Sequence, residues 1–304
     1  MEQQTYVVTG ATGNIGKVIA RTLCAHGKKV RVVGRSEERL WPLVADGAEA
    51  FVGSLDDARF LTRVFQDAKT AFVMIPPNFG AAYFRAYQNQ ISEALATAIT
   101  DAGVTQIVSL SSIGAQLAEG TGPIKGLHDH EQRLNRLDGV NVLQLRPGFF
   151  MENLLFNVEL IKHMGINGSP LEPNLPIPMI ATKDIAAVAA HLMEEASFRG
   201  KSVRELLGPR EVTMIEATKV LGRSVGKKDL QYVQFSYGDA RQAMLGMGMS
   251  VSVADEMIEM YQAMNEGRSR PTQSRSPENT TPTTLEDFAE TFAAFYGASA
   301  VAKA

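Results

Sequence analysis

Three glycines near the beginning of the sequence restrict its fold more than any other stretch. Gly10, Gly13 and Gly16 lie in VVTGATGNIGK, directly after an apolar run typical of a strand and at the start of a helical pattern. A backbone turn that approaches a pyrophosphate has no room for side chains: Gly10 allows the tight turn, Gly13 the close approach, and Gly16 the packing of helix on strand. The helix N-terminus adds free N–H groups and a positive dipole end. The stretch therefore predicts a dinucleotide-binding strand–turn–helix unit.

Apolar runs and helical patterns alternate over the first half of the chain. Between the runs, apolar residues recur every three or four positions, as in an amphipathic helix. Alternation of this kind, with nearly continuous apolar strands, predicts an α/β fold with a doubly wound parallel sheet, a Rossmann fold. The strands are expected at residues 5–9, 29–33, 48–52, 71–75, 106–110 and 142–146.

The pattern changes near residue 150, which suggests two parts. Residues 1–150 are expected to form the NAD(P)-binding Rossmann domain, to which residues 181–210 return, and residues 151–304 a smaller, mostly helical substrate or partner region. Residues 267–284 are rich in Pro, Ser and Thr and nearly devoid of apolar residues, which predicts a mobile loop. Asp56 and Thr182 are expected to cap helices.

The end of the second expected strand indicates which dinucleotide is preferred. A carboxylate about 20 residues past the glycines would bind both ribose hydroxyls of NAD. Arg35 and Ser36 stand there instead. A planar guanidinium and a hydroxyl suit a 2′-phosphate, so we predict NADP(H) as the cofactor, with NAD(H) as the alternative.

Further motifs follow in one order: VVGRS, FVGSLDD, FVMIPPN, IVSLSSIGA, HDHE and LRPGFFMENLL. With them the chain resembles the NmrA-like family of atypical short-chain dehydrogenases/reductases. That family includes NADPH-quinone reductases, triphenylmethane reductase and the redox-sensing regulator NmrA. The resemblance runs from about Thr5 to Thr182 and continues weakly to the closing helical pattern. It implies a dinucleotide site built along the whole carboxyl edge of the sheet.

The resemblance also implies which residues contact the cofactor, from the phosphates to the nicotinamide. Many relatives have an aspartate where this chain has Ser54, so the adenine contact of that aspartate is not carried over. The implied contacts are the phosphate turn at Gly10, Thr12, Gly13, Asn14 and Ile15; the 2′-phosphate end at Arg35 and Ser36; Leu55 over the adenine; Ile75, Pro76 and Pro77 along the ribose; and Pro147, Gly148 and Phe149 beside the nicotinamide.

The proton-transferring pair of ordinary short-chain dehydrogenases is missing. They use Tyr-x-x-x-Lys, in which the lysine lowers the tyrosine pKa. None of the 7 tyrosines has a lysine four residues on, and alignment on Glu131 places Pro123 and Leu127 at the two positions. Alcohol dehydrogenation by the usual route is therefore not expected. The catalytic residue stays unassigned; His128 is the candidate proton donor. A helix-face histidine bonded to backbone or water is the simpler interpretation.

An acceptor pocket is expected where the strands end. Ser112, His128, Phe150 and Asn153 are its predicted lining. The alternative interpretation of the serine is a cap at the end of a strand. His128 and His130 lack both a carboxylate ligand set and His-x-x-x-His spacing, so no metal site is predicted.

Two functions remain open. The first is hydride transfer from NADPH to a quinone or similar flat small-molecule acceptor, in which the protein mainly orients the two. The second is a non-catalytic NADP(H)/NAD redox sensor that acts through protein–protein contacts. The net charge of −3 argues against direct nucleic-acid binding. With no signal-peptide pattern and no apolar run of roughly 18 residues, we expect a cytoplasmic protein without membrane contact. The acceptor, a protein partner and the oligomeric state are not predicted.

Overall fold

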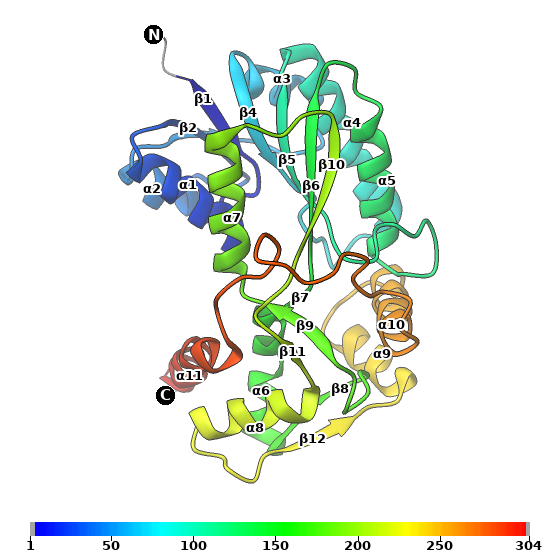
Figure 1. Cartoon of the computed structure of the whole chain (residues 1–304). Helices are drawn as coiled ribbons and strands as arrows, with labels where there is room; N and C mark the ends of the chain where they lie inside the picture. The colour runs from blue at the N-terminus through cyan, green and yellow to red at the C-terminus, as the bar shows by residue number, and fades with distance from the viewer. Residues whose placement is uncertain (1–3, 302–304) are drawn as a thin grey trace.

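A seven-stranded sheet forms the centre of the upper lobe in the computed structural model, which describes residues 4–301 (Figure 1). All of its strand pairs are parallel, in the order β10-β6-β5-β4-β1-β2-β3. The predicted doubly wound α/β fold is confirmed. The strands are β1 (Thr5–Val8), β2 (Lys29–Gly34), β3 (Glu49–Val52), β4 (Ala68–Val73), β5 (Gln106–Leu110), β6 (Asn141–Pro147) and β10 (Lys201–Leu206).

Helices cover both faces of this sheet, so each face buries its own apolar core. Helices α1, α2 and α7 lie on one side, and α3, α4 and α5 on the other (Figure 1). The strands are buried on both faces, which is why their sequences are apolar without strict alternation. The helices are α1 (Asn14–Ala25), α2 (Glu37–Ala45), α3 (Ala58–Phe65), α4 (Phe84–Ala102), α5 (Ile124–Asn135) and α7 (Thr182–Glu195).

The C-terminal lobe lies beneath the carboxyl edge of the sheet and has a third core. Besides helices it contains two small sheets, β11-β9-β7 and β12-β8. Its elements are β7 (Phe149–Phe150), η1 (Met151–Asn157), α6 (Val158–Met164), β8 (Ile166–Ser169), β9 (Ile177–Ile180), β11 (Glu211–Val212), α8 (Met214–Ser224), β12 (Gln231–Gln234), α9 (Tyr237–Gly246), α10 (Val251–Asn265) and α11 (Leu285–Val301).

Both helix caps expected from the sequence are wrong. Asp57, one residue after Asp56, caps α3 by accepting a 3.0 Å bond from the backbone N–H of Phe60. Helix α7 has no local side-chain cap, and Thr182 is its first residue. A distant carboxylate replaces the cap: Glu152 of η1 accepts from both the N–H (3.0 Å) and the hydroxyl (2.5 Å) of Thr182. Such a partner is supplied by tertiary packing and leaves no local signal.

The segment between α10 and α11 crosses the front of the molecule, between the sheet and the C-terminal lobe (Figure 1). We call residues 268–284 the strap. As predicted, it is a loop, with one isolated bridge between Leu207 and Thr280. Hydrogen bonds anchor it along its length, including two from Thr283 to the buried Asp184. The mobility expected from its composition remains a prediction.

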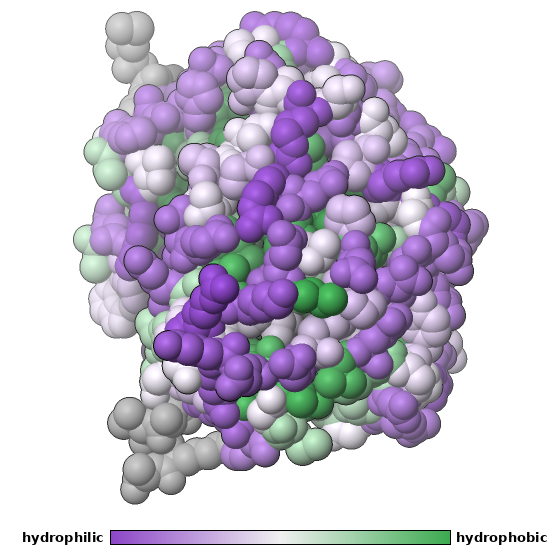
Figure 2. Space-filling model, turned by 60° about the horizontal axis from the view of Figure 1, so that its bottom comes forward, coloured by the Kyte–Doolittle hydropathy of each residue, from purple (hydrophilic) through white to green (hydrophobic). Residues whose placement is uncertain are grey.

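The surface of the C-terminal lobe is largely hydrophilic and is interrupted by apolar patches (Figure 2). Exposed apolar side chains of this lobe include Phe156 on η1 and Met164 on α6. Scattered exposure of this kind is ordinary on folded proteins. Within residues 4–301, no helix is both long enough and apolar enough to span a bilayer.

Candidate functional site

The phosphate turn between β1 and α1 has the shape that its glycines predict. Gly10 has φ +61°, a conformation in which glycine is favoured. A Cβ at Gly16 would overlap the carbonyl oxygen of Gly10, so helix and turn can pack only without a side chain there. The N-cap residue of α1 is Gly13, which has no side chain to bond the first N–H groups of the helix. No acidic residue lies in the first turn. The N–H groups at this helix end therefore remain available to an anion.

The turn lies where the strand order reverses. Strands β1 and β4 are neighbours, and the chain leaves β1 towards β2 but leaves β4 in the opposite direction, towards β5. Ligands of open α/β sheets bind at this crevice, outside the carboxyl ends of the strands. Thr9 joins the ends of β1 and β4: its hydroxyl donates to Phe72 O (3.1 Å) and accepts from Met74 N (3.1 Å). The hydroxyl of Thr9 therefore fixes the end of β1 relative to the end of β4, beside the turn.

A second arginine, which the sequence analysis missed, stands beside the turn. Arg39, in the first turn of α2, donates from its guanidinium to the carbonyl oxygen of Thr12 at 3.3 Å. Arg35 and Arg39 are both exposed, and neither forms an ion pair within the described part of the chain. Ser36 caps α2 by accepting from Arg39 N at 3.3 Å. Arg39 follows Arg35 by four residues at the start of a helix. That spacing, which puts two side chains on the same helix face, was the sequence signal that could have identified Arg39.

The loop after β4 is fastened by a tyrosine. Tyr87 of α4 donates its hydroxyl to Pro76 O at 3.0 Å, and burial raises the pKa of that hydroxyl. Ile75 packs against the core, whereas Pro77 is exposed. Leu55 is 8% exposed and belongs to the same core. The structure brings these residues to the carboxyl edge, and their contacts with a cofactor remain predictions.

The end of β6 joins the two lobes. The N–H of Gly148 donates to Leu206 O (2.9 Å), and a Cβ at Gly148 would overlap Pro178 O of the C-terminal lobe. The next two residues diverge: Phe149 packs with the C-terminal core and Phe150 with the core beneath α1 and α7. Asn153 is half-buried on η1. Phe150 and Asn153 thus follow the junction of the lobes, and their contacts with an acceptor remain predictions.

A buried ion pair lies under this edge and was not predicted. Arg146 of β6 contacts Glu131 of α5 through both nitrogen–oxygen pairs, at 2.8 and 2.5 Å. Ser111 donates its hydroxyl to the same carboxylate. Glu131 is 1% exposed and Arg146 9%. The pair links α5 to the end of β6, and its carboxylate accepts the hydrogen bond of the Ser111 hydroxyl. The neighbouring hydroxyl of Ser112 donates to Ile113 O at 3.0 Å.

No acid–base pair stands at the usual tyrosine and lysine positions. Pro123 is the N-cap of α5, and its carbonyl oxygen accepts from Gln88 at 2.9 Å. Lys125, near these positions, points to the C-terminal lobe, where it pairs with Glu259 (2.6 Å) and Glu256 (3.2 Å) of α10. These partners raise the pKa of Lys125 despite its partial burial, so its charge is already neutralised.

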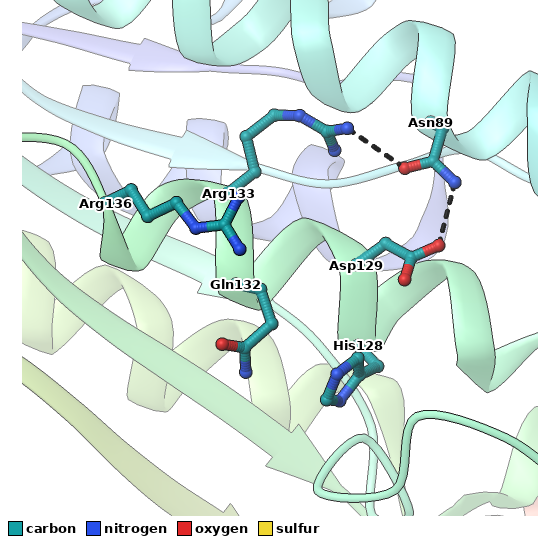
Figure 3. Close-up of a pocket in the computed structure, with 6 residues that line it drawn as sticks. All are labelled: Asn89, His128, Asp129, Gln132, Arg133 and Arg136. Atoms are coloured by element: carbon teal, nitrogen blue, oxygen red, sulfur yellow. Dashed lines mark hydrogen bonds between the residues drawn. The ribbon is translucent and has the colours of Figure 1, made fainter.

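His128 lies in a surface pocket between α4 and α5 (Figure 3). The pocket has a volume of about 380 Å³, and its other lining residues are all polar: Asn89, Asp129, Gln132, Arg133 and Arg136. The ring donates from Nδ1 to Ala115 O at 2.8 Å. This geometry favours the simpler interpretation, a helix-face histidine bonded to the backbone.

A model of the NmrA-like family matches residues 2–289 of the sequence. The chain belongs to the NmrA-like family. This NmrA-like chain is 30% identical over 257 residues to the NAD(P)H azoreductase of Xenophilus azovorans, covering 84% of this chain and 85% of that protein. The family expected from the motifs is therefore confirmed.

Two solved structures show how widely the fold is shared among proteins of different roles. The NADPH-dependent quinone oxidoreductase of Escherichia coli, crystallised with NADPH, superposes with a TM-score of 0.78 at 22% identity, covering 94% of this chain and 99% of that one. NmrA, a negative transcriptional regulator crystallised with NADP, superposes with a TM-score of 0.68 at 17% identity, covering 96% and 91%. At these identities, the likeness of the NmrA-like chain to both shows a common fold.

Proposed function

We propose that the protein binds NADPH and transfers its hydride to a quinone or similar flat acceptor. The observation that carries the proposal is the open phosphate turn flanked by two unpaired arginines. The phosphate turn has glycines where a side chain would fill the space that a pyrophosphate needs. The two guanidinium groups beside it can pair with a 2′-phosphate. The azoreductase and quinone oxidoreductase relatives support a reductase with a small-molecule acceptor.

Each part of the site has its own task in this proposal. The N–H groups of the turn hold the pyrophosphate, Arg35 and Arg39 hold the 2′-phosphate, and Phe149 walls the nicotinamide at the junction of the lobes. When bound, NADPH supplies the hydride. The chain orients the cofactor and the acceptor, and one quinone oxygen takes a proton from solvent water. NADPH, a proton and quinone thus give NADP⁺ and hydroquinone.

The absence of an acid–base pair at Pro123 and Leu127 favours a second candidate function. A protein that binds NADP(H) without turnover could report the redox state of the cofactor to a protein partner. The structural neighbour NmrA is a regulator crystallised with NADP, which supports keeping this alternative.

The test is the loss of NADPH absorbance with a panel of quinones and azo dyes, beside calorimetric NADPH binding. Turnover with at least one acceptor is expected, and Gly13→Val should abolish both binding and turnover because its side chain would enter the phosphate cradle. Gly246→Val is the matched control, since Gly246 has open space around it. Tight binding without turnover would favour the sensor, and unchanged binding in Gly13→Val would refute the site.

A further inference from the structure

Glu205 is a fully buried carboxylate on the edge strand β10. No Lys, Arg or His of residues 4–301 lies within ion-pair distance of it. Its oxygens accept instead from the strap: from Thr272 N at 2.9 Å, from the Thr272 hydroxyl at 2.8 Å and from Gln273 N at 2.8 Å. A buried carboxyl group without such donors would leave its oxygens unsatisfied, which strongly disfavours the folded state. The carboxylate and this part of the strap therefore require each other.

The strap also satisfies the free edge of β10. The side chain of Gln273 donates to Val203 O (3.1 Å) and accepts from Glu205 N (3.0 Å), as a neighbouring strand would. Further along, Leu207 N donates to Asn279 O and Thr281 N donates to Leu207 O, both at 2.8 Å. Edge strands with unpaired groups invite association, so covering the edge is one role of the strap. That role explains residues 273–281 but not where the strap begins.

The strap begins two strands away, at the end of β5. Arg268 donates to the carbonyl oxygen of Gly120, and Ser269 lies against Gly114 with its hydroxyl 3.4 Å from Ile113 O. Strands β5, β6 and β10 are neighbours in the sheet. Two inter-strand spacings amount to roughly 9.5 Å. The three residue steps from Ser269 to Thr272 reach about 10 Å when fully extended. Arg270 and Pro271 therefore lie between a contact at the end of β5 and a contact on β10, the two strands that flank β6.

The end of β6 is the Pro147–Gly148 segment, beside which the proposed function puts the nicotinamide. We propose that the strap is the roof of the acceptor site, that Arg270 and Pro271 limit which acceptors fit, and that Glu205 is the positioning residue that holds this roof. The inference rests on the proposed function, since an acceptor must lie beside the nicotinamide. Figure 1 shows the strap passing between the sheet and the C-terminal lobe, where it would form a third wall of the proposed site.

The experiment compares the unmodified protein with Glu205→Gln and with Thr272→Ala, a milder change at an exposed residue. Glu211→Gln is the control, because it makes the same replacement at an exposed glutamate. Hydrogen exchange over residues 268–276 measures how firmly the strap is held. Steady-state kinetics with 2-methyl-1,4-naphthoquinone measure acceptor use, and calorimetry measures NADPH affinity. Arg270→Ala is tested with naphthoquinones of increasing ring substitution.

Faster exchange in the strap and a rise of about fivefold or more in the acceptor KM are expected for Glu205→Gln, with NADPH affinity unchanged. A smaller change of the same kind is expected for Thr272→Ala, and Arg270→Ala should alter the order of preference among the quinones. A loosened strap with unchanged acceptor KM and kcat, or an unchanged strap in both variants, would overturn the proposal.

Failure of the proposed function gives a different result. If the unmodified protein turns over no quinone, exchange is measured in the NADP⁺ complex with and without the naphthoquinone. Protection of residues 269–273 by the quinone would keep the roof as a binding wall, whereas the absence of protection would refute it.

Discussion

The guanidinium of Arg39 donates a hydrogen bond to the carbonyl oxygen of Thr12, 3.3 Å away. This bond joins the start of α2 to the phosphate turn, two segments that are separated by α1 and β2 in the sequence. It places a cation beside the turn that no carboxylate neutralises among the described residues. Together with Arg35, it makes the predicted adenosine end of the site more strongly basic than the sequence analysis indicated.

Removing either arginine should shift the cofactor preference towards NADH. A hydrogen bond to a charged group is worth roughly 1.5–3 kcal/mol, about ten- to a hundredfold in affinity. Arg35→Ala and Arg39→Ala are each expected to weaken NADPH binding within that range and to leave NADH binding little changed, as measured by calorimetry. Arg223→Ala, which removes an exposed arginine from α8, is the control. An unchanged NADPH/NADH ratio in both variants would show that neither arginine contacts the 2′-phosphate.

Loss of the His128 side chain should have little effect on quinone reduction. The ring is bonded to Ala115 O and faces a polar surface pocket. A positioned general acid typically contributes 10²–10⁴-fold, so His128→Ala should lower kcat by well under about a hundredfold. Stopped-flow and steady-state rates with saturating NADPH would measure this. A loss of roughly a thousandfold or more with intact NADPH affinity would identify His128 as the proton donor instead.

Breaking the buried Glu131–Arg146 pair should destabilise the fold. Glu131→Gln leaves the Arg146 charge buried without its partner, and such changes cost about 3–5 kcal/mol. Denaturant unfolding should show this loss in the free energy of unfolding. The exposed pair Arg21–Asp46 gives the comparison, since Asp46→Asn should cost no more than about 1 kcal/mol. Equal effects of the two substitutions would contradict a structural role for the buried pair.

Acid should destabilise the protein partly through His130. The imidazole is fully buried beside Ser92, and burial, assisted by the nearby Arg133 charge, lowers its pKa to about 3. Between the unfolded pKa of 6.5 and about 3, the unfolded chain binds a proton that the folded chain does not. Stability is therefore full above the unfolded pKa and falls as the pH drops, by up to roughly 1.4 kcal/mol per pH unit.

The check is the pH dependence of unfolding in His130→Gln, which has no group to titrate. Its free energy of unfolding should fall less steeply between pH 6 and 4 than that of the unmodified protein. Parallel curves would mean that His130 is protonated equally in both states. His191→Gln, the same replacement at an exposed position on α7, is the matched control.

The sequence by itself determined the dinucleotide-binding half of the molecule. Gly10, Gly13 and Gly16 are local in the chain, and the turn they form depends on backbone conformation and on contacts within a single strand–turn–helix unit. The alternation of apolar runs and helical patterns is local in the same sense, so it predicted the parallel sheet. The absence of tyrosine and lysine at Pro123 and Leu127 was likewise visible in the sequence.

Only the tertiary structure decided which distant polar groups meet. Glu152 caps a helix that begins 30 residues later, and Glu205 binds a strap 67 residues away. Local patterns cannot reveal such pairs, because each partner alone is an unremarkable polar residue and the buried position that makes the contact necessary exists only in the folded chain. The path of the strap depends on the Glu205 contact, so the proposed roof could be inferred only from the folded chain.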